Sequence, residues 1–472
     1  MKDADRHALG EKSANPVSRY PWKTALTIAT FIALLLVPTV APALKNYKTV
    51  DLAKVPALLD FPVPKRPGDS TPSAVNPEDV RMERLQVLAP QNLVDPKHAL
   101  DHFYAALLKD SSARILHYGD SPTTGDLITA DARAMLQSQF GDGGAGFVLI
   151  AKPWAWYQHR GIEMEASGWQ IDPAGAGALH DGLFGLGGVS FRGSTSATAH
   201  WRLNDSHMRN IEVHYLLQPN GGSFTVEGDG QLLGTVDTSA DAKSAGYASF
   251  KIPPGARQFT LRVTAGEVRL FGADFRKAGP GVVYSALGVN GANVTLLSKA
   301  MGERFWTAVL RHYSPDLVIV NYGTNESGYP QFVEKTWGIE MREVVRRLHL
   351  ALPGVSVLLM SPMDRAERKN GGEIDTIASL PRLVEIEAKV ASDTGAAFFN
   401  TYSAMGGQGT MARWYTSEPR LVGADFIHPL PAGAKIVGEL LYKALRDGYN
   451  EYRVRNLKEH MAQDDSAQKA NP

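Results

Sequence analysis

The chain has no cysteine among its 472 residues. This absence excludes disulfide bonds, thiolate metal sites and a cysteine nucleophile. The chain also has no excess of charge of either sign, because Lys+Arg and Asp+Glu both number 49. With neither a net positive field nor a basic stripe with interleaved aromatic residues, nucleic acid is excluded as an expected partner.

Signals for metals and nucleotides are also missing. No group of His, Asp and Glu residues has the spacing of a metal-ligand motif, so the sequence predicts no metal. The glycines of 141–146 follow a predicted helix, whereas the glycines of a phosphate-binding loop precede one. We therefore expect no cofactor.

A long apolar run lies near the N-terminus. Residues 24–44 are 21 uncharged residues, and about 20 suffice for a helix to cross a membrane. Lysines and arginines precede the run, which predicts a cytoplasmic tail over 1–23 and an extracytoplasmic location for the rest. Ala41-Pro42-Ala43 also fits a signal-peptide cleavage site, although the long tail and long run favour an uncleaved anchor. Both alternatives predict a periplasmic catalytic part, and the anchor predicts a single-pass inner-membrane protein.

The segments that flank the folded part are polar or rich in proline. Residues 45–95 contain seven prolines, which predicts an extended spacer. Asp95-Pro96 fits an N-cap followed by proline at the first helical position. The polar residues 456–472 predict a disordered C-terminal tail.

Strand and helix patterns alternate over residues 96–159 and again over 280–446. This alternation predicts an α/β domain with a parallel sheet between two helical layers. The predicted strands are 113–118, 282–287, 316–322, 356–362 and 396–400, and the predicted helices are about 127–140, 294–312, 337–351, 380–394 and 432–446.

Short alternating apolar runs separated by turn residues occupy the stretch 160–279. Examples are IEVHYLL, SFTVEG, QFTLRV and VRLFGADF. This pattern predicts a β-sandwich of jelly-roll type, inserted into the α/β domain after its first strand–helix unit.

Four short segments follow predicted strands of the α/β domain or precede its last helix. They contain Ser121 in GDS, Gly291 in GVNGAN, Asn325 in NYGTNES, and Asp425 with His428 in DFIHP. Reactive groups collect at such strand ends in open α/β sheets. A serine needs a base to become nucleophilic, and a histidine held by a carboxylate supplies one. The N–H groups of Ser121 and Gly291 and the side-chain amide of Asn325 would stabilise the oxyanion.

These segments resemble the four blocks of the SGNH, or GDSL-like, hydrolase family. The resemblance assigns Ser121, Asp425 and His428 to the catalytic triad, and Ser121, Gly291 and Asn325 to the oxyanion hole. It also implies acyl-ester chemistry without a metal. The residues after Ser121 are Pro-Thr-Thr, where the GDSL form has leucine, and Gly288 flanks the same loop as Gly291.

The predicted insertion makes the resemblance more specific. An SGNH core interrupted by a β-domain is similar to periplasmic peptidoglycan O-acetylesterases, whose insert is carbohydrate-binding-module-like. This resemblance implies an O-acetylated cell-envelope glycan as the partner and its deacetylation through an acetyl-serine as the reaction. Two alternatives stay open: an O-acetyltransferase of an exported polysaccharide, and an inactive glycan-binding scaffold. The oligomeric state is not predicted.

Several other polar and aromatic residues have two interpretations. We expect His117 to be a core histidine and Asp364 a structural cap. Asp120 is expected to bind loop amides and position Ser121, and Glu326 to lie in a solvated loop. The tryptophans near the start of the insertion are either sugar-stacking platforms or packing residues, namely Trp154, Trp156 and Trp169.

Overall fold

The computed structural model of the chain describes residues 92–470. The predicted tail 1–23, the predicted membrane segment 24–44 and nearly all of the spacer 45–95 lie outside these residues, so the anchor and the localisation stay predictions. Within 92–470, no helix combines the length and the apolar character that a membrane span requires.

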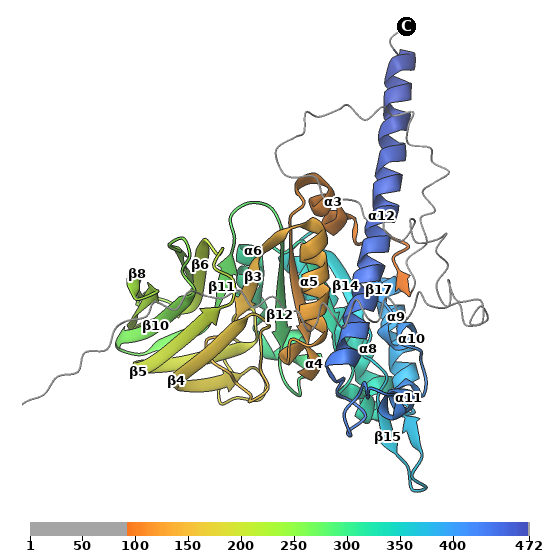
Figure 1. The fold of residues 1–472 in the computed structure, drawn as a ribbon, viewed down its shortest axis with the longest axis horizontal. Helices are drawn as coiled ribbons and strands as arrows, with labels where there is room; N and C mark the ends of the chain where they lie inside the picture. Colours follow the sequence, from red (N-terminus) through yellow and green to blue (C-terminus); the bar gives the residue numbers. More distant parts are fainter. Residues whose placement is uncertain (1–91, 471–472) are drawn as a thin grey trace, which may run out of the picture. The chain divides into compact units, whose positions relative to one another are not determined.

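A mixed sheet with a parallel centre organises the α/β half (Figure 1). The parallel strands follow one another in the spatial order β17, β14, β13, β2, β12 and β3, and the short β1 pairs antiparallel to β17 at the edge. The predicted α/β class is thereby confirmed. The strand bounds are β1 Leu93–Val94, β2 Ala113–Gly119, β3 Asp142–Val148, β12 Val282–Gly288, β13 Leu317–Asn321, β14 Ser356–Met360 and β17 Ala397–Phe399.

Successive residues of the central strands enter two different cores, because side chains alternate between the faces of a strand. Ile115 and Ile319 pack with residues of the helices on one face. Leu116 and Val318 join the core on the opposite face, which continues into the strands of the predicted insertion. The central strands therefore carry apolar side chains on both faces, as a sheet covered on both faces requires.

The helices match several of the predicted ranges. The range 380–394 coincides with α9, and the range 127–140 differs from α5 by one residue. The predicted helix 294–312 is divided, because Gly302 donates a backbone hydrogen bond to Gly182 between a five-residue turn and α6. The bounds are α3 Asp101–Asp110, α4 Ser121–Thr124, α5 Ile128–Phe140, α6 Glu303–Tyr313, α7 Pro330–Phe332, α8 Gly338–Ala351, α9 Leu380–Thr394, α10 Thr401–Ala404, α11 Thr410–Thr416 and α12 Pro431–Ala470, and a small hairpin is formed by β15 Ala366–Arg368 and β16 Ile374–Thr376.

Along the chain, eight antiparallel strands separate the two stretches of the α/β half, within residues 162–276. In space they lie to one side of the parallel strands (Figure 1). One branch has the order β4, β5, β10, β7, β8, and β6 pairs with both β9 and β11. The likeness of this region to a carbohydrate-binding module stays a prediction. The bounds are β4 Ile162–Pro173, β5 Val189–Leu203, β6 Asn210–Leu217, β7 Ser223–Gly228, β8 Gln231–Asp237, β9 Ser244–Lys251, β10 Gln258–Ala265 and β11 Val268–Arg276.

Strand β3 joins the two regions and was not predicted. It pairs parallel with β12 and antiparallel with β11, so hydrogen bonding continues from the α/β sheet into the antiparallel strands. Its sequence, DGGAGFV, is rich in glycine, which has low strand propensity. Close approach of two backbone segments explains this composition. At Gly143, for example, a Cβ would lie 2.8 Å from the carbonyl oxygen of Gly281.

The first described helix begins later than predicted. Asp95 does accept backbone hydrogen bonds, from Ala99 at 2.7 Å and Leu100 at 3.1 Å. However, His98 has a φ of 57°, which interrupts a right-handed helix. Helix α3 therefore starts at Asp101, and Asp95 closes a turn before it.

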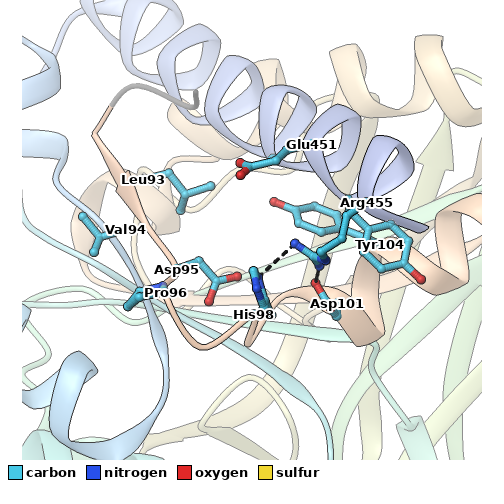
Figure 2. Close-up of a pocket in the computed structure, with 11 residues that line it drawn as sticks. Leu93, Val94, Asp95, Pro96, His98, Asp101, Tyr104, Glu451 and Arg455 are labelled. Carbon is cyan, nitrogen blue, oxygen red and sulfur yellow. Dashed lines mark hydrogen bonds and ion pairs between the residues drawn. The ribbon is translucent and has the colours of Figure 1, made fainter. Parts of the chain in front are cut away.

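The C-terminal segment is helical where disorder was predicted. Helix α12 extends from Pro431 to Ala470. Figure 2 shows one reason: Arg455 on α12 donates to His98 Nδ1 at 2.9 Å and also binds Asp101 on α3. The later residues include many good helix formers and no glycine, so the helix continues beyond this contact.

Candidate active site

Ser121 lies where β2 ends and α4 begins. Gly119 closes the strand, and a Cβ at this position would come within 2.2 Å of Thr123 Oγ1, so the turn requires glycine. Asp120 is the residue before the helix, and Pro122 occupies its first turn. Because α4 has only four residues, local backbone N–H groups are the main electrostatic feature here, and a long helix dipole is not available.

Three predicted residues form a continuous hydrogen-bonded chain. Ser121 Oγ lies 2.7 Å from His428 Nε2, although the two residues are 307 positions apart. His428 Nδ1 lies 2.7 Å from Asp425 Oδ2. The structure therefore brings together a hydroxyl, an imidazole and a carboxylate in the order that activates a serine.

The loop before α12 holds the histidine and the carboxylate in place. The amide of Gly423 donates to the carbonyl of His428 at 2.8 Å and closes the loop. Asp425 Oδ1 accepts the amides of Ile427 and His428 at 3.0 and 3.1 Å. Phe426, between the two polar residues, has a left-handed φ of 57° and a buried ring. Asp425 Oδ1 is thus used by the backbone, and Oδ2 is left for the imidazole.

The environment of Asp425 favours its ionised form. Burial raises the pKa of this carboxyl, but the hydrogen bonds from His428 and from the amides of Ile427 and His428 outweigh burial and lower it. An ionised carboxylate can orient the imidazole and stabilise the imidazolium that forms when the serine loses its proton.

The two predicted oxyanion segments lie against each other. Asn325 Nδ2 donates to the carbonyl of Ala292 at 2.8 Å, which places the side chain beside the loop that contains Gly291. Gly291 has a φ of 67° and open space where a Cβ would project. Gly288 belongs instead to the end of β12, where a Cβ would come within 2.1 Å of the Thr124 nitrogen on α4.

Glu326 is a supporting residue that the sequence analysis missed. It was expected in a solvated loop, but only 2% of it is exposed. Its carboxylate accepts the amide of Val294 at 2.7 Å and the amide of Gly323 at 3.1 Å. Burial raises the pKa of Glu326 to about 7. The Glu326 side chain therefore joins the loop after β12 to the loop after β13. Nothing in the local sequence pattern indicates that this side chain is buried.

Asp120 also differs from expectation. Its side chain is buried and has a hydrogen bond from Thr324 and one from its own backbone amide, whereas its Oδ2 has no hydrogen-bond partner. Burial raises the pKa of Asp120 to about 6, against the opposite effects of Thr324, His428 and Arg365. The residue thus adds a titratable group close to His428.

Two polar residues have the structural roles predicted for them. His117 is buried, and its Nδ1 lies 2.6 Å from the hydroxyl of Tyr284. Asp364 accepts the hydroxyl of Thr376 and the amide of Met411, both at 2.8 Å, so it caps the start of α11. Both predictions are confirmed.

The three tryptophans separate into packing residues and one surface residue. Trp154 and Trp169 pack against the large core, and Trp169 Nε1 donates to the carbonyl of Thr198. Trp156 is 50% exposed, and its Nε1 donates to Asn290 Oδ1 at 3.1 Å. Asn290 directly precedes Gly291, so an exposed aromatic face lies beside the candidate oxyanion loop.

The comparisons agree with this fold. Residues 254–436 match the profile of the GDSL-like Lipase/Acylhydrolase family, a stretch that includes four of the five predicted site residues but not Ser121. A search of curated protein sequences finds no match. Among solved structures, a peptidoglycan O-acetylesterase has a TM-score of 0.64 and 23% identity, and the alignment covers 76% of this chain and 99% of that chain.

Two further solved structures are more distant. A protein of Bacillus subtilis has a TM-score of 0.30 and 15% identity over 61% of this chain and 91% of that chain. A salicylyl-acyltransferase from a tetracycline biosynthetic pathway has a TM-score of 0.27 and 13% identity over 61% of this chain and 98% of that chain.

The fold is an α/β fold of SGNH-like type, and it brings Ser121, His428 and Asp425 into one hydrogen-bonded chain. More particularly, residues 254–436 are similar to the GDSL-like lipase/acylhydrolase family.

Proposed function

We propose that the protein is a serine esterase that removes O-acetyl groups from peptidoglycan or another cell-envelope polysaccharide. The observation that carries the proposal is the chain of 2.7 Å contacts from Ser121 through His428 to Asp425. The likeness in fold to a peptidoglycan O-acetylesterase supports an O-acetylated glycan as the substrate class.

In the first half of the reaction, His428 Nε2 takes the proton of Ser121 as Oγ attacks the acetyl carbonyl. Asp425 stabilises the resulting imidazolium through Nδ1. The N–H groups of Ser121 and Gly291 and the second N–H of the Asn325 side chain would donate to the oxyanion. Collapse of the tetrahedral intermediate breaks the bond to the sugar oxygen, which takes the proton from His428, and acetyl-Ser121 remains.

In the second half, water attacks acetyl-Ser121 with His428 again as the base. The bond from the acetyl carbon to Ser121 Oγ then breaks, acetate leaves, and Oγ takes the proton back from His428. The exposure of the triad favours this hydrolysis over transfer to a sugar. The side chains of Asp425 and His428 are 48% and 45% exposed, so bulk water has access to the acyl-enzyme. Transfer would be favoured by a site that excludes water.

Trp156 is the aromatic residue that we propose as a contact for the sugar. An exposed indole face next to Asn290 and Gly291 suits stacking against the apolar face of a pyranose. We further propose that the sequence-predicted segment 24–44 anchors the protein in the inner membrane, which would place the site on the side of the cell-envelope glycans.

The test compares the wild-type chain with Ser121→Ala and with the matched control Ser167→Ala, which alters an exposed serine in β4. Acetate release is measured from p-nitrophenyl acetate and from O-acetylated peptidoglycan, with and without an acceptor oligosaccharide. We expect the wild type and Ser167→Ala to release acetate and Ser121→Ala to release none. Acetylation of the acceptor in place of release would turn the assignment to a transferase. Glycan binding without any Ser121-dependent turnover would indicate a scaffold.

A further inference from the structure

A second cluster of reactive side chains lies away from the triad. Glu212 and His214 are two positions apart on β6 and therefore project from the same face of the strand. His312 reaches them from the C-terminal turn of α6. The cluster thus combines residues of the antiparallel region with a residue of the α/β half.

The ligand atoms have the separations of a shared metal shell. Glu212 Oε1 lies 3.2 Å from His214 Nε2 and 2.9 Å from His312 Nε2, and one ligand atom from each residue lies within 4.8 Å of the others. Ligands bonded to tetrahedral zinc at about 2.0–2.1 Å are roughly 3.3 Å apart. A zinc-sized ion can therefore bind all three residues after small side-chain adjustments.

His214 supplies an independent reason to place a ligand there. Its side chain is only 1% exposed, and neither ring nitrogen has a partner with hydrogen-bond geometry, although Nε2 is near Glu212. A buried nitrogen without a hydrogen bond is costly and uncommon in native proteins. A metal ion on Nε2 would use the lone pair that faces the cluster.

Neighbouring residues hold the three candidate ligands in position. Ser249 Oγ donates to Glu212 Oε2 at 2.6 Å, which leaves Oε1 for the histidines. The ring of Tyr247 stacks on His312 with a centroid distance of 3.4 Å and packs edge-on against His214. Such outer partners are typical of metal sites, because they fix the orientation of the ligands.

We propose that Glu212, His214 and His312 bind a divalent transition-metal ion of the zinc type that joins β6 to α6. Two imidazoles and one carboxylate are a ligand set of known zinc sites, and a water would occupy the fourth position. Glu212 and His312 are 19% and 35% exposed, so both the ion and this water have access from solvent. The site is separate from the triad, because its ligands lie on β6 and α6 and not on the elements that hold Ser121, Asp425 and His428.

The sequence does not reveal this cluster, since Glu212 and His312 are 100 residues apart. A hydrogen-bonded Glu–His pair without metal is the competing account of the same contacts. The two explanations predict different results when zinc is added to the purified protein. A metal site predicts tight binding and a higher melting temperature, whereas a metal-free Glu–His pair predicts neither.

The experiment uses the full chain after removal of metal with a chelator and dialysis. Zinc is added at equilibrium, and bound zinc per chain and the melting temperature are measured for the wild type and three variants. His312→Gln and Glu212→Gln remove one ligand each. His207→Gln is the matched control, because His207 is an exposed histidine that lies 2.7 Å from Asp205.

We expect one zinc per wild-type chain and a rise in melting temperature on binding. Each ligand variant should bind zinc more than about 100-fold more weakly, since even outer-shell changes cost 10–100-fold. The His207→Gln chain should bind like the wild type. The cobalt-loaded wild type should show the visible absorption of a four-coordinate site.

Three results would overturn the proposal: no tight zinc binding by the wild type, undiminished binding by the folded ligand variants, or equal weakening in His207→Gln. Circular dichroism establishes whether the variants are folded. If both ligand variants are unfolded, the cobalt spectrum of the wild type decides, and absence of four-coordinate bands rejects the site.

Discussion

The side-chain amide of Asn325 donates a hydrogen bond of 2.8 Å to the carbonyl of Ala292. This contact joins the two loops that are predicted to form the oxyanion hole. A carboxamide nitrogen carries two hydrogens, so one remains for a developing oxyanion when the other is bound to Ala292. The same bond that positions the side chain therefore leaves it competent to act in the reaction.

Replacement of Asn325 by alanine should lower kcat about 10²–10³-fold for both p-nitrophenyl acetate and glycan, with KM little changed, because an oxyanion donor acts mainly in the transition state. Steady-state kinetics check this expectation. Asn400→Ala is the matched control, since Asn400 caps α10 through Ser403 and has no contact with the site loops. A kcat within twofold of wild type would remove Asn325 from the oxyanion hole.

Asp425→Asn should lower kcat about 10⁴-fold while the protein stays folded. The amide cannot hold the imidazole in the required tautomer, and the loss in comparable triads has this size. The control is Asp205→Asn, which removes another aspartate in contact with a histidine and should leave kcat unchanged. Comparable kcat values for the two variants would contradict the role of Asp425.

Trp156→Ala should raise KM for O-acetylated peptidoglycan about 5- to 10-fold and leave the kinetics with p-nitrophenyl acetate unchanged. This range corresponds to a stacking contribution of about 1 kcal/mol. Trp156→Phe keeps an aromatic face but loses the hydrogen bond to Asn290, so it should restore most of the affinity. If both variants bind glycan like the wild type, Trp156 is not a sugar contact.

Asp120 should make stability depend on pH. Burial raises its pKa from the ordinary 3.8 to about 6, so between these values the native state keeps a proton that the unfolded state releases. The contribution of the Asp120 carboxyl to the free energy of unfolding is therefore present at low pH and is lost as the pH rises toward 6. Relative to wild type, the free energy of unfolding of Asp120→Asn should increase by about 2 kcal/mol between pH 4 and pH 7.

Urea denaturation of wild type and Asp120→Asn at several pH values measures this difference. The control variant is Asp241→Asn, because Asp241 is exposed and its replacement shows the effect of losing one carboxylate at the surface. A difference between Asp120→Asn and wild type that stays constant over the pH range would show that the Asp120 carboxyl does not titrate as described.

Much of the α/β half was predictable because its signals are local. Apolar runs such as that of β13 are buried on both faces, and helix α9 follows its amphipathic pattern over its full length. The triad was predictable for a different reason. Its residues lie in short segments that resemble the blocks of the SGNH family, and their types suit the activation of a serine by a histidine and a carboxylate.

Other features depend on contacts that no local pattern carries. Strand β3 has a glycine-rich sequence because its backbone lies close to Gly281, a neighbour that is distant along the chain. Helix α12 extends past its predicted end in the region where Arg455 meets α3. Glu326 was expected in solvent, but the amides of two separate loops converge on its carboxylate.

The sequence by itself determined the α/β class and the main strands along the chain, since these follow from periodicity, and its resemblance to the SGNH blocks indicated the candidate triad. Only the tertiary structure decided which polar groups are buried and which distant residues meet. It joined β3 to β11, buried Glu326 behind the oxyanion loops, and placed His312 against Glu212. The physical reason is that burial and partnership of a polar side chain depend on residues far along the chain, and these become neighbours only when the layers pack.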